Sequence, residues 1–447
     1  MVTGELAEAV QRVRAVLDQD PENLSALRDL SRGLLRMGRL DEAAEVAAKA
    51  TAAAPWSAKA LMFEADIEYQ RGRRQRALEL VDRSLELDDR FLEARLDRSR
   101  YLAALGRKNE AIEEIEPLLE ESADNPWVAL RYVEVVELPA GNHRAAEGRL
   151  RTVLSRKPLL VEAWVMLGMV FVSEGRSADA VAVYREATGY RPDDADLQAR
   201  LALLLAEIAD PTAETALREA IRSSPAVRAD LHVSLGELLA ARGQRDQARQ
   251  QFEIAAEAPT FSTGTRNSRG MALLRLGRVA EAEKVWRELI RDHPDYGRAY
   301  LNMASLSIQR RDWPAVERLA RAAVEREPRS TAAWNNLGIG LEELGRTAEA
   351  EAAYRRGSEV DANDWRALLN LGILLRKSAR FDEAAAIQQE VLTRAPSNPG
   401  AHFELGMLYA GPLADVERAK AHLRVTIDAD PNHPRARQAR VVLDKLP

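Results

Sequence analysis

Three asparagines recur at one interval in the sequence: Asn302, Asn336 and Asn370 are 34 residues apart, and Asn335 lies beside the middle one. A primary amide donates hydrogen bonds through its NH2 group and accepts them through its oxygen, as a peptide group does. Amides at the same position of successive units could therefore pair with the backbone of an extended polypeptide. The chemistry that this spacing favours is recognition of a peptide.

The residue types that usually carry catalysis or bind metals form no recognisable constellation. The histidines are scattered, without the H-E-x-x-H pattern or another paired spacing typical of zinc sites. There is no Gly-Lys dipeptide, which excludes a Walker-type phosphate loop, and no cysteine, which excludes disulfides and thiolate metal sites. The sequence therefore predicts a protein that is not an enzyme and takes no cofactor or metal. The histidines are His143, His232, His293, His402, His422 and His433.

The composition is that of a folded, soluble chain. Of its 447 residues 46% are hydrophobic and 30% are charged, and the low aromatic content of 5% leaves Ala, Leu and Val as the main apolar residues, which favours helix. A net charge of −6 without a basic stripe argues against nucleic-acid binding. The charged N-terminal stretch indicates neither a signal peptide nor a membrane anchor. We therefore expect a cytoplasmic protein without direct membrane insertion.

Helical periodicity recurs along the chain in units closed by turn residues. A Gly-Arg turn follows the first helix of many units, at Gly38, Gly106, Gly175, Gly277 and Gly345, and a proline often ends the second helix. Residues 5–17 read as a lone second helix, and 433–446 as one end helix that covers the last apolar face. Complete units begin near Leu24, Ala58, Leu92, Trp127, Val161, Ala195, Ala229, Thr263, Gly297, Thr331, Trp365 and Pro399.

The residue types of the unit resemble the tetratricopeptide repeat (TPR) family, whose signature is W-x2-L-G-x2-Y, then A-x3-F, then P. The fullest match is Trp164, Leu167, Gly168, Phe171, Ala180, Tyr184 and Pro192. The resemblance implies an all-α fold, a right-handed superhelix of about twelve helix-turn-helix repeats with a partial N-terminal repeat and a C-terminal capping helix. Small residues such as Gly168 and Ala180 are expected to let the paired helices approach closely.

In the TPR family the first helices of successive repeats line a concave groove that binds proteins. By this resemblance, one groove region here holds the repeated asparagines, which we call the asparagine ladder, with apolar residues beside them. A second region, around Tyr132, Val165, Met166 and Met169, is apolar; it could bind a partner, or its side chains could equally bury one another. Farther upstream the groove carries charged residues of both signs, which indicate a solvated face. They are Arg28, Asp29, Arg32, Asp66, Asp97 and Arg100. The candidate partner-binding residues are Asn302, Asn335, Asn336, Asn370, Leu301, Ile339, Leu369, Ile373, Tyr132, Val165, Met166 and Met169.

A carboxylate clamp of the kind found in TPR chaperone adaptors is disfavoured. By resemblance, that clamp needs a basic residue and an asparagine in the unit before the ladder asparagine. Ahead of Asn336 those positions hold Leu301 and Ser305. We therefore do not expect this chain to grip a C-terminal carboxylate in that way.

The boundary near 257–267 is rich in Thr, Ser and Gly, which favours a flexible joint. It would divide the chain into an N-terminal array, 1–261, with the partial repeat and about seven repeats, and a C-terminal array, 262–447, with about five repeats and the capping helix. An ordinary variant junction between repeats is the alternative.

The function expected from these patterns is a non-catalytic scaffold that binds a partner peptide or helix in its groove. Two alternatives stay open. Repeats could pair between molecules to build a homo-oligomer, or the chain could be the substrate-recruiting arm of a larger glycosyltransferase-like or membrane-anchored assembly, for which the half repeat at the start leaves room upstream.

Overall fold

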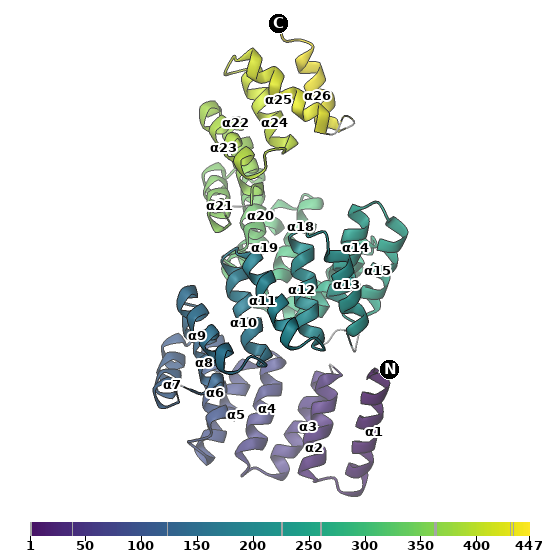
Figure 1. The fold of residues 1–447 in the computed structure, drawn as a ribbon, viewed down its shortest axis with the longest axis vertical. Helices are drawn as coiled ribbons and strands as arrows, with labels where there is room; N and C mark the ends of the chain where they lie inside the picture. Colours follow the sequence, from purple (N-terminus) through teal and green to yellow (C-terminus); the bar gives the residue numbers. More distant parts are fainter. Residues whose placement is uncertain are drawn as a thin grey trace. The chain divides into compact units, whose positions relative to one another are not determined.

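The computed structural model describes residues 2–37, 39–122, 124–224, 227–259, 262–361, 364–429, 431 and 433–447, and within them it contains helices and turns but no strand (Figure 1). The helices are α1 (Val2–Gln19), α2 (Leu24–Arg36), α3 (Leu40–Ala53), α4 (Ala58–Gln70), α5 (Arg74–Leu87), α6 (Leu92–Ala104), α7 (Lys108–Glu121), α8 (Pro126–Tyr132) with its π-helical continuation η1 (Val133–Glu137), α9 (His143–Arg156), α10 (Val161–Ser173), α11 (Ser177–Tyr190), α12 (Ala195–Glu207), α13 (Ala213–Ser223), α14 (Ala229–Ala241), α15 (Arg245–Glu257), α16 (Thr263–Arg275), α17 (Val279–Asp292), α18 (Gly297–Gln309), α19 (Trp313–Arg326), α20 (Thr331–Glu343), α21 (Thr347–Val360), α22 (Arg366–Lys377), α23 (Phe381–Arg394), α24 (Pro399–Ala410), α25 (Val416–Ala429) and α26 (Pro434–Leu443).

The helices follow the predicted order of repeats. Each even-numbered helix from α2 to α24 is the first helix of a repeat, and it begins at the predicted residue or one residue away. The lone helix α1 packs against α2, and α26 packs against α24 and α25. The all-α repeat fold, with its partial first repeat and its end helix, is thereby confirmed for the described residues.

The chain forms two compact units, Met1–Val285 and Trp286–Pro447, here called unit 1 and unit 2. Their boundary lies within α17. The flexible joint expected near 257–267 stays a prediction, and Thr260 and Phe261 within it lie outside the described residues.

A left-handed residue follows most of the first helices. Gly106, Gly175, Gly277 and Gly345 have φ between 73° and 79°, as the Gly-Arg turns predicted, whereas Gly38 lies outside the described residues. Ala209, Arg311 and Ala379 adopt the same conformation at φ 55° to 59°. Because a side chain there costs about 1–2 kcal/mol, packing of the two helices outweighs local backbone preference at these turns.

The two helices of a repeat meet where a glycine faces an aromatic ring. A Cβ added to Gly168 would lie 2.3 Å from Cζ of Tyr184, and one added to Gly338 would lie 2.4 Å from Cε1 of Tyr354. Both tyrosines are buried. The close approach expected at Gly168 is therefore a direct contact between its backbone and the tyrosine ring.

In three repeats an aromatic residue near the start of the first helix is hydrogen-bonded to the turn that ends the preceding repeat. The indole Nε1 of Trp164 donates to the carbonyl of Pro158 at 2.8 Å, and that of Trp334 donates to Pro328 at 2.8 Å. The hydroxyl of Tyr300 donates to the carbonyl of Pro294 at 2.9 Å. This hydrogen bond satisfies a carbonyl in the turn that follows the preceding second helix, so a large aromatic side chain that carries a polar hydrogen fits these three positions.

The end helix α26 closes the last apolar face, although it is shorter than predicted. Ala436 and Ala439 are buried, and Val442 packs with Phe403 and Leu423. The helix ends at Leu443 instead of Leu446. Pro447 accounts for part of this difference, because a proline disfavours helical geometry at the residue before it.

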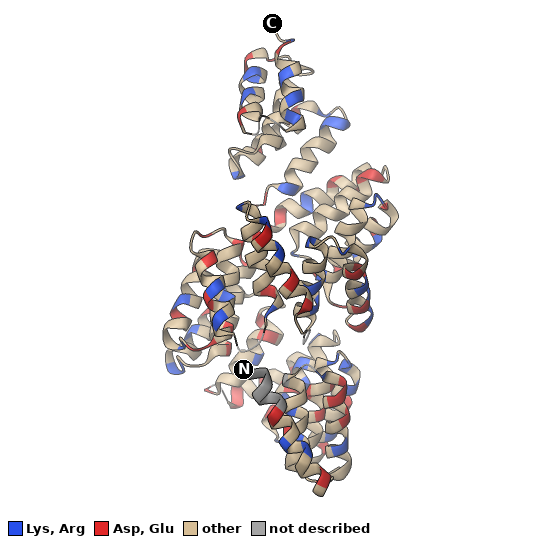
Figure 2. Ribbon diagram, turned by 90° about the vertical axis from the view of Figure 1, so that its right-hand side faces the viewer, with Lys and Arg blue, Asp and Glu red and all other residues tan. Residues whose placement is uncertain are grey.

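Residues of both charge signs are interspersed along the helices of both units (Figure 2). None of the helices in the described parts of the chain is long and apolar enough to cross a bilayer.

Candidate functional site

The asparagine ladder, Asn302, Asn336 and Asn370, lies in unit 2 on the successive first helices α18, α20 and α22. The amide Nδ2 of Asn336 donates to Oγ of Ser305 on α18 at 3.0 Å. The Nδ2 of Asn370 donates to Oδ1 of Asn335 on α20 at 2.8 Å. The ladder therefore links neighbouring first helices to one another, a role that spacing alone did not reveal.

Burial divides the ladder into a closed and a more open part. Asn336 is only 8% exposed, whereas Asn302, Asn335 and Asn370 are half-buried. An amide NH2 group has two N–H donors, so one hydrogen bond inside the protein leaves a second donor on the same nitrogen. The half-buried amides are the ones with surface left for a ligand.

The apolar residues predicted beside the ladder are half-buried. Leu301, Ile339 and Leu369 pack against the core of unit 2 while keeping part of their surface open, and Ile373 is half-buried as well. Together with the amides they give this face alternating polar and apolar contacts.

The second predicted region lies in unit 1. Val165 and Met166 pack against the core around α10, and Tyr132 packs below the guanidinium of Arg149, which lies 4.8 Å from its ring centre. Met169, by contrast, is 51% exposed. Tyr132, Val165 and Met166 are thus partly covered by the core, and Met169 is the open member of the region.

A pocket of about 630 Å³ lies on the first helices of unit 1, and we call it the Trp127 pocket. Its walls come from α4, α6, α8, η1 and α10, and they include Met62, Leu96, Arg100, Trp127, Arg131 and Met166. Of the residues predicted for partner binding, Met166 lines it.

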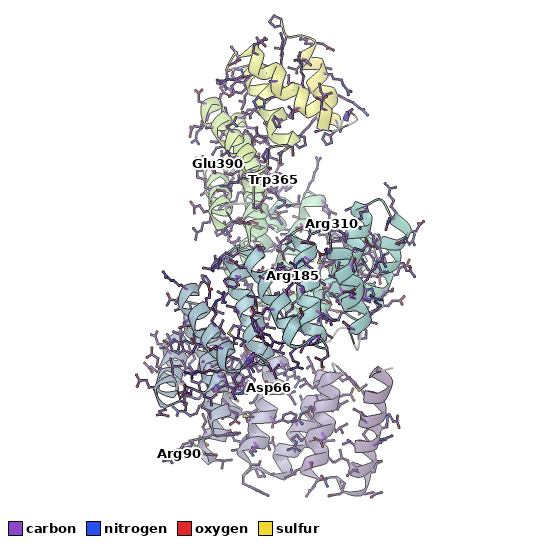
Figure 3. The ribbon with its side chains drawn as sticks, viewed as in Figure 1. Asp66, Arg90, Arg185, Arg310, Trp365 and Glu390 are labelled. Carbon is purple, nitrogen blue, oxygen red and sulfur yellow. The ribbon has the colours of Figure 1, made fainter. Side chains whose placement is uncertain are left out.

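An ion-pair network forms one wall of the Trp127 pocket. The carboxylate of Asp97 lies 3.0 Å from Arg100 and 3.2 Å from Arg131, and Arg100 also contacts Asp66 of α4 at 3.3 Å. Of these residues, Asp66 is labelled in Figure 3. Burial raises the pKa of Asp97, and the two guanidinium groups partly oppose that rise. The guanidinium of Arg100 also lies 4.8 Å from the ring centre of Tyr69.

This wall differs from the solvated face that the sequence suggested. The sequence did carry a signal, because the Asp66–Arg100 and Asp97–Arg131 pairs are each 34 residues apart, as the ladder asparagines are. A residue interval equal to the repeat length places two side chains at equivalent positions of adjacent first helices.

The histidines include one close pair. His402 on α24 and His422 on α25 have their Nδ1 atoms 2.8 Å apart. The sequence did not predict this contact, because the two residues belong to different helices and are not separated by the length of a repeat. Across the described residues no group of three or more His, Cys, Asp or Glu side chains is arranged to hold a metal ion.

The stacked helix pairs define a helical repeat protein, and the sequence comparison identifies the kind of repeat. The tetratricopeptide repeat family matches residues 64–126, 137–195, 166–210, 304–359, 340–399 and 369–434, and further models of the same repeat match 3–67 and 264–306. The chain belongs to the tetratricopeptide repeat family.

Two curated relatives match parts of the chain. Cellulose synthase operon protein C of Xanthomonas axonopodis pv. citri (strain 306) is 26% identical over 278 residues, which are 59% of this chain and 17% of the relative. A TPR repeat-containing protein of Dictyostelium discoideum is 26% identical over 136 residues, 29% of this chain and 51% of the relative. The chain thus spans a small part of one relative and about half of the other.

The fold also matches a solved structure. The crystal structure of the APC/C hetero-tetramer Cut9–Hcn1 aligns with a TM-score of 0.62 at 14% identity, covering 99% of this chain and 94% of that one. At this identity the match supports the tetratricopeptide architecture.

Proposed function

We propose that the chain is a non-catalytic scaffold that binds an extended segment or helix of a partner protein along the first helices of its repeats. The observation that carries this proposal is the repetition of an amide at one position of α18, α20 and α22, flanked by half-buried apolar side chains. Helices that are already stacked lose little freedom on binding, which lowers the ordering cost on the receptor side.

Within unit 2 the amides would hold the backbone of the segment. Asn302, Asn335 and Asn370 carry the larger share of this role, because Asn336 is nearly covered. Leu301, Ile339, Leu369 and Ile373 would receive alternate side chains of the same segment. Such a site tolerates many sequences, since the backbone is common to all of them.

The test is a pull-down with the purified chain and with its Asn302→Ala/Asn336→Ala/Asn370→Ala variant, with captured proteins identified by mass spectrometry. We expect a partner that the wild type retains and the variant loses. Gln389→Ala, at an exposed position of the second helix α23, is the matched control and should retain it. Equal capture by the wild type and the triple variant would contradict the binding role of the asparagine ladder but not the scaffold function.

A second candidate is the recruiting arm of a larger polysaccharide-synthesising assembly. It is favoured by the relative named cellulose synthase operon protein C, to which 59% of this chain aligns. A glycosyltransferase subunit among the captured proteins would support this second candidate. If the proteins that depend on the asparagine ladder for capture include no such subunit, the result would count against it.

Self-assembly and location are separable by simple measurements. Sedimentation at two protein concentrations distinguishes a monomer from a homo-oligomer, because an oligomer sediments with a multiple of the chain mass and a reversible one loses mass on dilution. The cytoplasm is the compartment in which we expect cell fractionation to find the chain.

A further inference from the structure

The cationic groups of the Trp127 pocket are already paired with the protein's own carboxylates. Arg100 contacts Asp97 and Asp66, and Arg131 contacts Asp97 and Glu134. The two arginine side chains are 23% and 15% exposed. A ligand that enters the pocket therefore meets guanidinium groups that are neutralised and mostly covered.

Two carboxylates of the same pocket have no such partner. Glu93 of α6 and Glu162 of α10 line the pocket and are exposed, and neither forms an ion pair with a described residue. With Asp97 and Glu134 they make four lining carboxylates against the guanidinium groups of Arg100 and Arg131, a formal charge of −2. The pocket therefore attracts a cation.

The apolar part of the pocket suits the stem of a long cationic side chain. Trp127 is 50% exposed on α8, and the pocket also includes Met62 of α4 and Met166 of α10. An indole face attracts an ammonium or guanidinium group, and methionine side chains adapt to flexible aliphatic stems. Aliphatic surface and negative charge thus occur together in one cavity of about 630 Å³.

We propose that the Trp127 pocket binds a partner segment through a lysine or arginine side chain, whose charge pairs with Glu93 and Glu162 and whose stem packs against Trp127. This assignment rests on the proposed scaffold function and gives unit 1 a preference of its own. The asparagine ladder of unit 2 would bind the backbone of a partner segment, whereas this pocket would select a positively charged side chain. An acidic segment would be repelled by the same carboxylates.

The experiment is a selection from a displayed library of random peptides against the full-length chain and against its Glu93→Gln/Glu162→Gln variant. We expect the peptides enriched on the wild type and depleted on the variant to be rich in Lys and Arg. By fluorescence anisotropy their affinity should fall about tenfold or more in the variant, and weaken with salt, because charged contacts are lost or screened. Trp127→Ala should weaken the same peptides.

Matched substitutions control for the loss of charge and of an exposed ring. Glu113→Gln/Glu116→Gln removes two exposed carboxylates from the second helix α7, and Trp56→Ala removes an indole that is 72% exposed. Both should leave the selected peptides bound. Identical selections on wild type and Glu93→Gln/Glu162→Gln, or a depleted set without positive charge, would overturn the proposal.

The result is independent of the ladder experiment. Loss of partner capture in the triple asparagine variant tests unit 2, and that variant retains Glu93, Glu162 and Trp127. If the peptide selection enriches no cationic peptides while the pull-down still finds a partner that depends on the asparagine ladder, only the proposal for the Trp127 pocket is refuted.

Discussion

Asn370 on α22 donates a hydrogen bond to Asn335 on α20, with Nδ2 and Oδ1 2.8 Å apart. A residue that would grip a peptide thus also joins two repeats. Each repeat of such a protein is stabilised by its neighbours, so a hydrogen bond between first helices contributes to the interface that transmits this stability. Any test of peptide binding by the ladder must therefore separate binding from the stability of the repeat interface.

A double-mutant cycle measures how much the hydrogen bond between Asn370 and Asn335 contributes to the stability of the repeat interface. We expect Asn370→Ala and Asn335→Ala to couple by about 0.5–1.5 kcal/mol, the usual net contribution of a hydrogen bond. The readout is native-state hydrogen exchange of amides in α20 and α22, because a long repeat array does not unfold in two states. Pairing Asn370→Ala with Ser305→Ala, which belongs to α18, should give additive effects. Additive effects for Asn370 with Asn335 would contradict the contact.

The glycine of the repeat signature offers a sharper prediction about packing. Gly168→Ala would place a Cβ 2.3 Å from the ring of Tyr184, so the helix pair must shift, and we expect a loss of about 1–3 kcal/mol in the opening free energy of α10 and α11. Gly148, within α9, has no atom within 4 Å of an added Cβ. Gly148→Ala should instead stabilise its helix by about 0.5–1 kcal/mol, because alanine is the better helix former.

Hydrogen exchange of both variants measured together provides the comparison. Equal effects of Gly168→Ala and Gly148→Ala would show that the tyrosine does not limit the approach of the two helices.

The repeat boundaries were predictable because they depend on local signals. A proline or left-handed glycine ends a helix wherever it occurs, and helical periodicity is visible within a single segment. First helices therefore begin within one residue of prediction, from Leu24 to Pro399. The close approach of the two helices at Gly168 was predictable for the same reason, since this glycine belongs to the repeating signature, whereas its contact with the ring of Tyr184 is visible only in the structure.

The partners of polar side chains were not predictable in the same way. Whether Asn370 contacts a ligand or Asn335 depends on rotamers and on the small rotation between adjacent helices, which periodicity does not contain. Repeat spacing did mark Asp97 and Arg131 as equivalent in position, yet their burial beside the pocket follows from the neighbouring helices. The π-helical turn Val133–Glu137 had no signal in the repeat spacing, because the left-handed glycine that follows it, Gly141 with φ 72°, stands at its usual position.

That π-helical turn carries a buried ion pair. Glu137 is 4% exposed, and one of its carboxylate oxygens accepts from Nε and Nη2 of Arg149 at 3.0 and 2.8 Å. Arg149→Ala leaves the carboxylate buried without its cation, so we expect α8 and α9 to lose about 3–5 kcal/mol. The Arg149→Met/Glu137→Leu variant should lose less, because neither charge remains.

An exposed ion pair gives the control for that prediction. Arg249 and Glu253 lie on the surface of α15, and Arg249→Ala should cost no more than about 1 kcal/mol. If Arg149→Ala and Arg249→Ala cost the same by hydrogen exchange, the Glu137 carboxylate is hydrated rather than buried.

The histidine pair has a proton arrangement that the repeat itself dictates. His402 occupies the place of Trp164 and Trp334, and its Nε2 lies 3.0 Å from the carbonyl of Pro396. Since the indole nitrogen donates there, Nε2 of His402 carries the hydrogen, and its Nδ1 is the acceptor when the ring is neutral. The Nδ1–H of His422 then donates to it, so the pair cannot be doubly protonated without repulsion.

This arrangement predicts a loss of stability in mild acid. Burial lowers the pKa of His422, and the charges of His402 and Arg418 act in the same direction. A folded-state pKa below the ordinary value of about 6.5 means that protonation favours the unfolded chain, so the stabilisation is complete above that pH and declines as the pH falls below it. His422→Phe keeps a ring beside Tyr409 and removes the titrating group. In this variant the opening free energy of α24 and α25, measured by hydrogen exchange, should therefore fall less than in the wild type between about pH 7.5 and pH 5.5. His433→Asn, which keeps a side-chain acceptor at the start of α26, should follow the wild type. An unchanged pH dependence in His422→Phe would show that the pair does not titrate in this range.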